Sequence, residues 1–450
     1  MIRKVKPDDA CDKTSSINKE ILRLAIPNMI SNILIPMLGI IDTAIAGYIG
    51  EDVNIAALSI GTTIFGFIYW NCSFLRMGTS GITAQAYGAK RKKECANTLI
   101  RSLWLALLIA FMLVAFQRPI GNFSLYVMQG SSKVQELAAE YLFARIWAVP
   151  ASITLFALHG WFIGMQDAKT PMIISIISMI ANAIFCLIFV FRFDMGIAGI
   201  AYGTVLAQYL ALLCTGILWF IKYSSYIKYF DIKESFRLKP IISFLHINKD
   251  IFLRSACVVL VYTFFTAASA RFGDTILATN SLLMQLFMLF SYMSDGIAYA
   301  GESLSGRFVG EKNAYLLKRF IRLLMFWSVV IALFFVLIYV VAWKQILMIF
   351  SPSEEILNLA GTYIGWIIAV PLVGCIPFMI DGIMVGATKT ILLRNTVFIS
   401  TALFFACFYA LTPIIGNIAL WLSFLIFLFS RGVLLYFCSD KLNVNKIIER

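Results

Sequence analysis

An isolated aspartate, Asp42, lies within a long apolar stretch near the start of the sequence. It belongs to the run from Leu38 to Gly47, and no other charged residue occurs between Arg23 and Glu51. An ionisable side chain inside a membrane-spanning helix costs about 2.5–3.5 kcal/mol on insertion scales, so it is a functional candidate by default. A carboxyl in apolar surroundings favours its neutral form and can take up a proton. Asp42 is therefore a candidate for reversible proton binding, and the alternative is a carboxylate held by helix-end hydrogen bonds.

Polar residues elsewhere in the same half can contact Asp42. Asn182 and Thr204 fall in two later apolar stretches, and either can supply a hydrogen bond to the carboxyl. Both residue types also serve as ordinary hydrogen-bond partners between membrane helices. Pro27 and Pro36 precede Asp42, and proline removes a backbone hydrogen bond, so the helix that carries Asp42 is expected to bend.

The second half contains a further candidate polar site. Asp295, Glu302 and Asp381 lie near the ends of two predicted helices, with Asp295 the deepest. The alternative for Glu302 and Asp381 is that they snorkel or order loops beside neighbouring basic residues. His159 precedes Asp381 by 222 residues and suits either a proton relay or simple packing at a helix end.

The composition requires lipid as the solvent for most of the chain. The 450 residues are 60% hydrophobic and 14% charged, with a mean hydropathy of +0.86, whereas soluble domains carry about 25% charged residues. A membrane-spanning helix needs about 20 mostly apolar residues. This length predicts an all-α integral membrane protein with twelve transmembrane helices, near 21–47, 54–77, 97–117, 135–162, 170–191, 197–221, 250–271, 275–300, 318–343, 355–383, 392–412 and 416–437.

The basic residues predict the orientation of these helices. Only six of the 37 Lys and Arg residues, counting Arg145 near the outer part of the fourth helix, fall on one side of the membrane. The other side is strongly basic and is therefore cytoplasmic, with both termini there. The net charge of +13 is thus explained by basic loops on one side of the bilayer, and we expect no nucleic acid as a partner. The first 20 residues are polar, so we expect no removable signal peptide, and we expect a multi-pass monomer in the cell inner (plasma) membrane.

Short sequence matches repeat along the chain at nearly one offset. Gly160-Trp-Phe-Ile-Gly164 corresponds to Gly382-Ile-Met-Val-Gly386, which lies 222 residues later, and Tyr87-Gly-Ala-Lys90 corresponds to Val309-Gly-Glu-Lys312. Six helices are an even number, so both halves start on the same side and form a parallel repeat. The predicted boundaries are an N-lobe at 1–222, a basic cytoplasmic loop at 223–248 and a C-lobe at 249–450. The alternative is an ancient duplication without alternating motion.

Motifs for other energy sources and chemistries are absent from the sequence. It contains no GxxxxGK[ST] loop for ATP, no HExxH motif and no CxxC pair with metal spacing. We therefore expect no cofactor and no resident metal, and an ion gradient as the energy source.

Three segments resemble the multidrug and toxic compound extrusion (MATE) family. Ile26-Pro27 through Asp42-Thr43-Ala44 to Gly50 is similar to its first helix, and Asp381-Gly-Ile-Met-Val-Gly-Ala-Thr388 adds another match. The segment Asn248-Lys-Asp-Ile-Phe-Leu-Arg-Ser255, followed by Tyr292 to Glu302, resembles the DinF branch specifically.

This resemblance implies a two-lobe antiporter that exports cationic or lipophilic small molecules against inward proton or sodium flow. The family's coupling aspartate, asparagine and threonine fall on Asp42, Asn182 and Thr204. A second family aspartate falls on Cys186, and a thiol does not replace a carboxylate as an ion ligand, so protons are favoured over sodium. Two alternatives stay open: a flippase of lipid-linked saccharides in the same superfamily, and a membrane-embedded enzyme acting on lipid.

Overall fold

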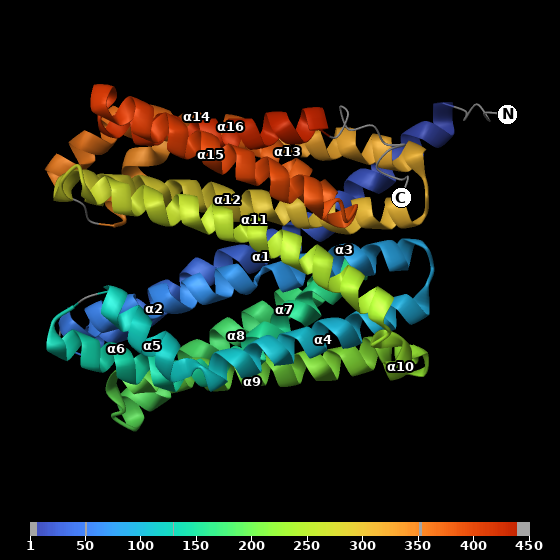
Figure 1. Ribbon diagram of the computed structural model, residues 1–450, viewed down its shortest axis with the longest axis horizontal. Helices are drawn as coiled ribbons and strands as arrows, with labels where there is room; N and C mark the ends of the chain where they lie inside the picture. Colours follow the sequence, from blue (N-terminus) through green and yellow to red (C-terminus); the bar gives the residue numbers. More distant parts are fainter. Residues whose placement is uncertain (1–6, 50–51, 129, 351–352, 439–450) are drawn as a thin grey trace. The chain divides into compact units, whose positions relative to one another are not determined.

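The computed structural model describes residues 7–49, 52–128, 130–350 and 353–438. Within these ranges, twelve helical segments are long and apolar enough to span a membrane, as predicted. The first half of the chain comprises α1 (Pro7–Tyr48), α2 (Asp52–Cys72), α3 (Phe74–Gly88), α4 (Lys92–Ala115), α5 (Gln117–Met128), α6 (Ser132–Arg145), η1 (Ile146–Ala148), α7 (Val149–Gly164), α8 (Lys169–Leu187), η2 (Ile188–Arg192), α9 (Gly196–Tyr223), η3 (Ser224–Tyr229) and α10 (Ile232–Ser235). The second half comprises α11 (Leu238–Ala270), α12 (Asp274–Gly310), α13 (Ala314–Met348), α14 (Glu354–Gly386), α15 (Thr390–Ile415) and α16 (Asn417–Cys438) (Figure 1).

Two of the predicted membrane helices are each built from two α-helices in the structure. The helix expected at 54–77 consists of α2 and α3, which meet at Ser73 and continue to Gly88. The helix expected at 135–162 consists of α6 and α7, joined by the 3₁₀ turn η1. Apolar composition fixes the length of a span but not the continuity of its hydrogen bonds, so the sequence pattern does not reveal these breaks.

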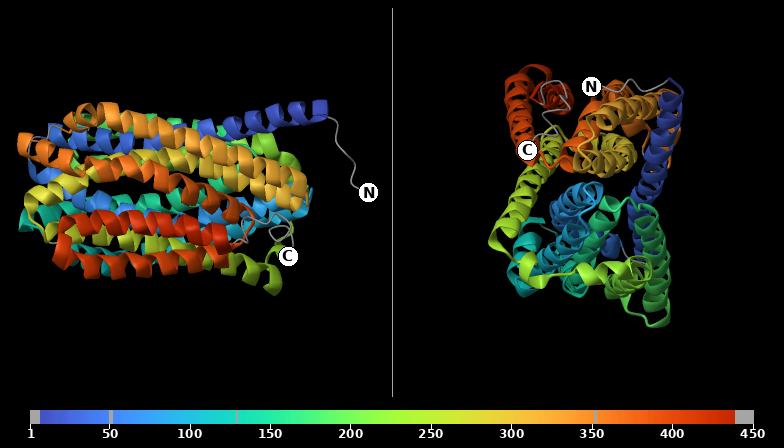
Figure 2. Two further views of the ribbon diagram at one scale, coloured as in Figure 1. Left: turned by 90° about the horizontal axis from the view of Figure 1, so that it is seen from above. Right: turned by 90° about the vertical axis from the view of Figure 1, so that its right-hand side faces the viewer.

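The chain divides into two compact units. One, called here the N-unit, contains residues 30–86 and 90–245, and the other, the C-unit, contains residues 1–29, 87–89 and 246–450. In the N-unit α8 and α9 lie side by side, as do α15 and α16 in the C-unit (Figure 1). Within each unit the axes of the long helices are roughly aligned, which is clearest in the left view of Figure 2. The start of α1 packs in the C-unit, where Trp327 Nε1 donates a hydrogen bond of 3.2 Å to Asn18 Oδ1.

The segment between the two halves is more helical than predicted. Helix α11 begins at Leu238, so residues 238–248 of the expected loop are helical, with Pro240 in the first turn, where its missing N–H is tolerated. The short helix α10 is fixed to α4 within the N-unit: Lys93 Nζ lies 3.0 Å from Asp231 Oδ2, and Arg101 Nε donates a hydrogen bond of 2.9 Å to Ser235 O.

The two halves share the same backbone path at three helix ends. Non-glycine residues with positive φ are uncommon, and they serve to end helices. Here positions with positive φ, five non-glycine residues and one glycine, recur at one spacing, since 312 − 90, 388 − 166 and 416 − 194 all equal 222. The pairs are Lys90 with Lys312, Gln166 with Thr388, and Asp194 with Gly416, all at φ values between 50° and 64°. The predicted parallel repeat is thereby confirmed in the backbone.

A glycine contact is also repeated. A Cβ on Gly160 of α7 would lie 2.3 Å from the carbonyl oxygen of Arg76 on α3. In the C-unit, a Cβ on Gly382 of α14 would lie 2.3 Å from the carbonyl oxygen of Ala298 on α12. Small residues let membrane helices approach until their backbones touch. The predicted glycine repeat therefore corresponds to one helix–helix joint built twice.

Candidate functional site

Asp42 lies near the end of α1 and is almost completely buried in the N-unit, with 1% of its surface exposed. Its hydrogen-bond partner in the described structure is Cys186 of α8, whose Sγ lies 3.9 Å from Asp42 Oδ1. We expected this polar contact to come from Asn182 or Thr204. It comes instead from the thiol at the position where the family has an aspartate.

Asn182 and Thr204 join α8 to α9 beside this contact. Asn182 Nδ2 donates a hydrogen bond of 2.9 Å to Thr204 Oγ1, which in turn donates to Ile200 O at 3.0 Å. Cys186 Sγ lies 3.4 Å from the same carbonyl oxygen. Gly203 makes this close approach possible, because a Cβ there would lie 2.6 Å from Cys186 Sγ. The three predicted residues thus lie in one unit, with Cys186 next to Asp42 and to the carbonyl that Thr204 binds.

Irregular backbone lies beside this site on two helices. The regular helix α8 ends one residue after Cys186 and continues as the π-helical turn η2. Helix α6 ends at Arg145 and continues through the 3₁₀ turn η1. Such turns within helices often mark functional hinges, and the carbonyls that they release are oriented differently from those of an α-helix.

Arg145 is the residue of this site that sequence reasoning missed. We expected it among the few basic residues on the outer side of the membrane. The structure adds that it is buried, with 9% of its surface exposed, in the same compact unit as Asp42. Its guanidinium donates a hydrogen bond to the hydroxyl of Tyr141 and lies 5.0 Å from the centre of the Phe65 ring. Its place inside the predicted helix 135–162 was the available signal, because an intramembrane charge is rarely incidental.

The C-unit contains a separate buried charge cluster around Asp381. The carboxylate oxygen Oδ2 accepts hydrogen bonds from Arg254 of α11 and from Arg431 of α16. Asp381 and Arg431 are 4% and 2% exposed, so the cluster is shielded from solvent. The alternative expectation, that Asp381 orders a loop beside a nearby basic residue, is replaced by an ion-pair network that connects three helices.

The other predicted residues have different surroundings. Asp295 is half-buried on α12, in the same unit as Asp381. Glu302 is buried on α12, where its backbone oxygen faces Gly386. His159 lies on α7 in the N-unit, and the charge that acts on it is Arg76, not Asp42.

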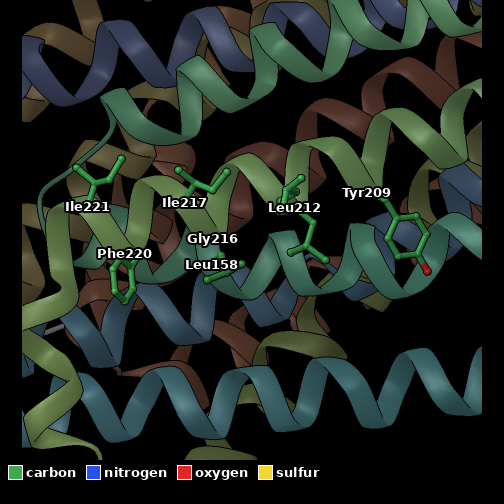
Figure 3. A pocket seen from close by; sticks show the side chains of 8 residues that line it. Leu158, Tyr209, Leu212, Gly216, Ile217, Phe220 and Ile221 are labelled. Carbon is green, nitrogen blue, oxygen red and sulfur yellow. The ribbon is translucent and has the colours of Figure 1, made fainter.

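An apolar groove of about 690 Å³ lies along α7 and α9 in the N-unit. Figure 3 shows its lining side chains, which include Leu158, Tyr209, Leu212, Phe220 and Ile221. None of them is charged, and several are more than a third exposed, as is usual for a surface that contacts lipid. The groove therefore offers no charged side chain to an ion, the Tyr209 hydroxyl being the polar side-chain group in its lining (Figure 3), and it is separate from the Asp42 site.

Comparisons with known proteins agree with this architecture. The sequence profile of the MatE family matches residues 27–188 and again residues 251–411. The chain is 34% identical over 421 residues to the DNA damage-inducible protein F of Escherichia coli, covering 93% of this chain and 91% of that protein. It is 24% identical to a probable multidrug resistance protein NorM of Synechocystis sp., over 66% of this chain and 65% of that protein. A solved MATE structure in a bent conformation superposes with a TM-score of 0.85, at 19% identity, covering 96% of both chains.

Proposed function

Since the chain belongs to the MatE family of multidrug and toxic compound efflux transporters, we propose that it exports cationic or lipophilic small molecules in exchange for protons. Members of this family are transporters and not enzymes, so the reading as a lipid-modifying enzyme is set aside. Family membership also favours efflux over the flipping of lipid-linked saccharides. The observation that carries the proposal is the burial of Asp42, which is 1% exposed and beside a thiol.

Proton coupling is supported by the groups around Asp42. A proton needs one acidic oxygen in apolar surroundings, whereas a metal cation needs several oxygen ligands. Cys186 supplies sulfur, and Asn182 Nδ2 is bonded to Thr204 Oγ1. Asn182 Oδ1 has no hydrogen-bond partner in the described structure, but one carbonyl oxygen beside a carboxylate falls short of a metal-cation ligand set. In this proposal Asp42 takes up a proton on the outer side and releases it inward, and Asn182 and Thr204 keep α8 and α9 in register. Protons are preferred over sodium, and no cofactor takes part.

Transport by alternating access is the mechanism that a parallel repeat supports, because two related lobes rock against each other around a central site in such transporters. The second-lobe residues Asp295, Glu302 and Asp381 then have a different role from Asp42. The Asp381 carboxylate already binds two guanidinium groups, so we assign it to the internal order of the C-unit.

The charge distribution supports the location of the transporter. Basic residues gather on one side of the predicted helices, and from this we infer that both termini are cytoplasmic and that the multi-pass protein lies in the cell inner membrane. We propose a monomer whose partners are the bilayer and the transported small molecule, with no nucleic acid bound.

The test is proton release driven by an organic cation in everted vesicles. The variant Asp42→Asn keeps the side-chain shape but binds no proton, and we expect it to lose coupling while expression persists. Asp194→Asn is a matched control, because Asp194 has a φ of 50°, which asparagine tolerates, and lies outside the predicted site. Normal coupling in Asp42→Asn, or equal loss in the control, contradicts the assignment.

A further inference from the structure

The apolar groove of the N-unit follows α9 to its last turn. Its lining on α9 extends from Tyr209 to Phe220 and Ile221, and Leu158 of α7 belongs to it as well (Figure 3). At 1.5 Å per residue, this stretch of α9 is about 18 Å long. The hydrocarbon core of a bilayer is about 30 Å thick, so the groove is about as long as one leaflet is deep. This length fits a single acyl chain that runs from the membrane surface toward its centre.

Gly216 lies in the middle of this lining and leaves the groove open. A Cβ at this position would meet nothing within 4 Å, so close packing of helices does not require a glycine there. The side chains on either side of it, Leu213 and Ile217, are 62% and 50% exposed. Within the hydrocarbon region, an exposed apolar surface of this kind contacts lipid chains.

Two lysines without acidic partners lie where α9 ends. Helix α9 continues directly into η3, which contains Lys228, and η3 packs against α4, whose first residue is Lys92. The ammonium groups of Lys228 and Lys92 lie 5.2 Å and 5.9 Å from the centre of the Tyr229 ring, within the range of a cation–π interaction. In the part of the chain that the structure describes, neither lysine forms an ion pair, whereas the adjacent Lys93 is paired with Asp231.

The surrounding segments are basic as well. Residues 90–94 contain four basic residues and one acidic residue, and residues 222–239 contain five basic and two acidic residues. Basic segments next to membrane helices attract the anionic lipids of the cytoplasmic leaflet. A zwitterionic lipid could fill the groove, but its headgroup would not compensate this charge. The charge at the end of the groove therefore favours an anionic headgroup.

We propose that this groove binds one anionic phospholipid of the cytoplasmic leaflet, with an acyl chain along α9 and the headgroup phosphate between Lys92 and Lys228. The phosphate supplies the negative charge that the two lysines lack, and the chain covers the open surface at Gly216. Because Lys92 begins α4 and Lys228 belongs to η3, the bound headgroup joins the start of the segment between the two halves to the N-unit. This inference goes beyond the proposed transport function and does not depend on the coupling role of Asp42.

The first test measures lipid binding to the purified full-length protein in detergent by native mass spectrometry. The probes are phosphatidylglycerol and phosphatidylcholine with the same acyl chains, and we expect the wild type to bind phosphatidylglycerol more tightly. The double variant Lys92→Gln/Lys228→Gln should lose about fivefold in affinity for phosphatidylglycerol per lysine, which corresponds to about 1 kcal/mol each, and none for phosphatidylcholine. Arg118→Gln, an exposed position on α5 beyond the opposite end of α4, is the matched control. Equal affinity of the wild type for both lipids, or an unchanged preference in the double variant, overturns the proposal.

The second test fills the groove with a side chain. Gly216→Leu places its side chain where nothing lies within 4 Å, so it should keep the wild-type melting temperature in detergent but lose most of the bound phosphatidylglycerol. Gly66→Leu is the control, because a Cβ there also meets nothing within 4 Å and the position lies on α2, outside the groove. Equal lipid binding in the two variants overturns the proposal. A wild-type dimer that Gly216→Leu separates would assign the groove to a second copy of the chain and would overturn it too.

Discussion

The thiol of Cys186 lies 3.9 Å from Oδ1 of Asp42, on a different helix and 144 residues away in sequence. It occupies the place where related transporters often have a second carboxylate. A weak hydrogen-bond donor thus faces the acid where a second negative charge would otherwise stand. In the proposed mechanism, the number of acids at this position determines how many protons the N-unit can bind.

Cys186→Asp should therefore change the pH range of transport. Two carboxyls at this distance resist simultaneous ionisation, so one stays protonated to higher pH. We expect proton release in everted vesicles to extend upward in pH, measured between about pH 6 and 9. Cys186→Ser is the control, since it adds no acid. If the aspartate and serine variants have the same profile, the side chain at position 186 does not influence Asp42.

Gly160→Ala and Gly382→Ala should destabilise the protein by similar amounts. In both cases the new Cβ would lie 2.3 Å from a backbone oxygen, so two helices must separate. Overpacking of this kind costs about 1–3 kcal/mol of unfolding free energy. Denaturation in mixed micelles measures it. Gly66→Ala is the control because a Cβ there meets nothing within 4 Å, and a comparable loss in that variant would refute the explanation.

Asp381→Asn should be more damaging than loss of an exposed ion pair. Without the carboxylate charge, the guanidinium groups of Arg254 and Arg431 lose their shared partner, and removing one member of a buried pair costs about 3–5 kcal/mol. Glu311→Gln is the comparison. Glu311 accepts a 2.8 Å bond from Arg307 at a site 27% exposed, where a pair contributes about 0.5 kcal/mol. Equal losses of unfolding free energy would show that the Asp381 cluster contributes little to stability.

The acid stability of the loop between α7 and α8 should depend on Asp167. Burial alone would raise the pKa of Asp167, but hydrogen bonds from Thr170 and Lys222 outweigh it and hold the pKa below its ordinary value. A lowered native pKa means that the stabilisation is complete above the ordinary pKa and is lost as the pH falls through the native one. The melting-temperature difference between the wild type and Asp167→Asn should therefore shrink below about pH 4. A constant difference down to pH 3 would contradict this linkage.

The positions of the membrane spans and the choice of Asp42 as a candidate residue could be predicted for the same physical reason. Lipid tolerates only apolar runs of sufficient length, and it makes a single acid within such a run conspicuous. The repeat was predictable because the glycines that let backbones touch cannot be replaced without a clash.

The partners of the charged residues were not predictable. Asp381 binds Arg254 and Arg431, which are 127 and 50 residues away, and no local pattern encodes such distances. The break at η1 and the burial of Arg145 depend on tertiary packing, including that of α6 against α2, which periodicity alone does not specify.

The doubled glycine joint has a consequence for how motion can be observed. With backbones in contact, α3 and α7 are constrained to move as one body, and so are α12 and α14. Spin labels placed on the two members of either pair should report a fixed separation throughout a transport cycle. Such a pair provides a constant reference distance, with which changes in label separation elsewhere in the protein can be compared.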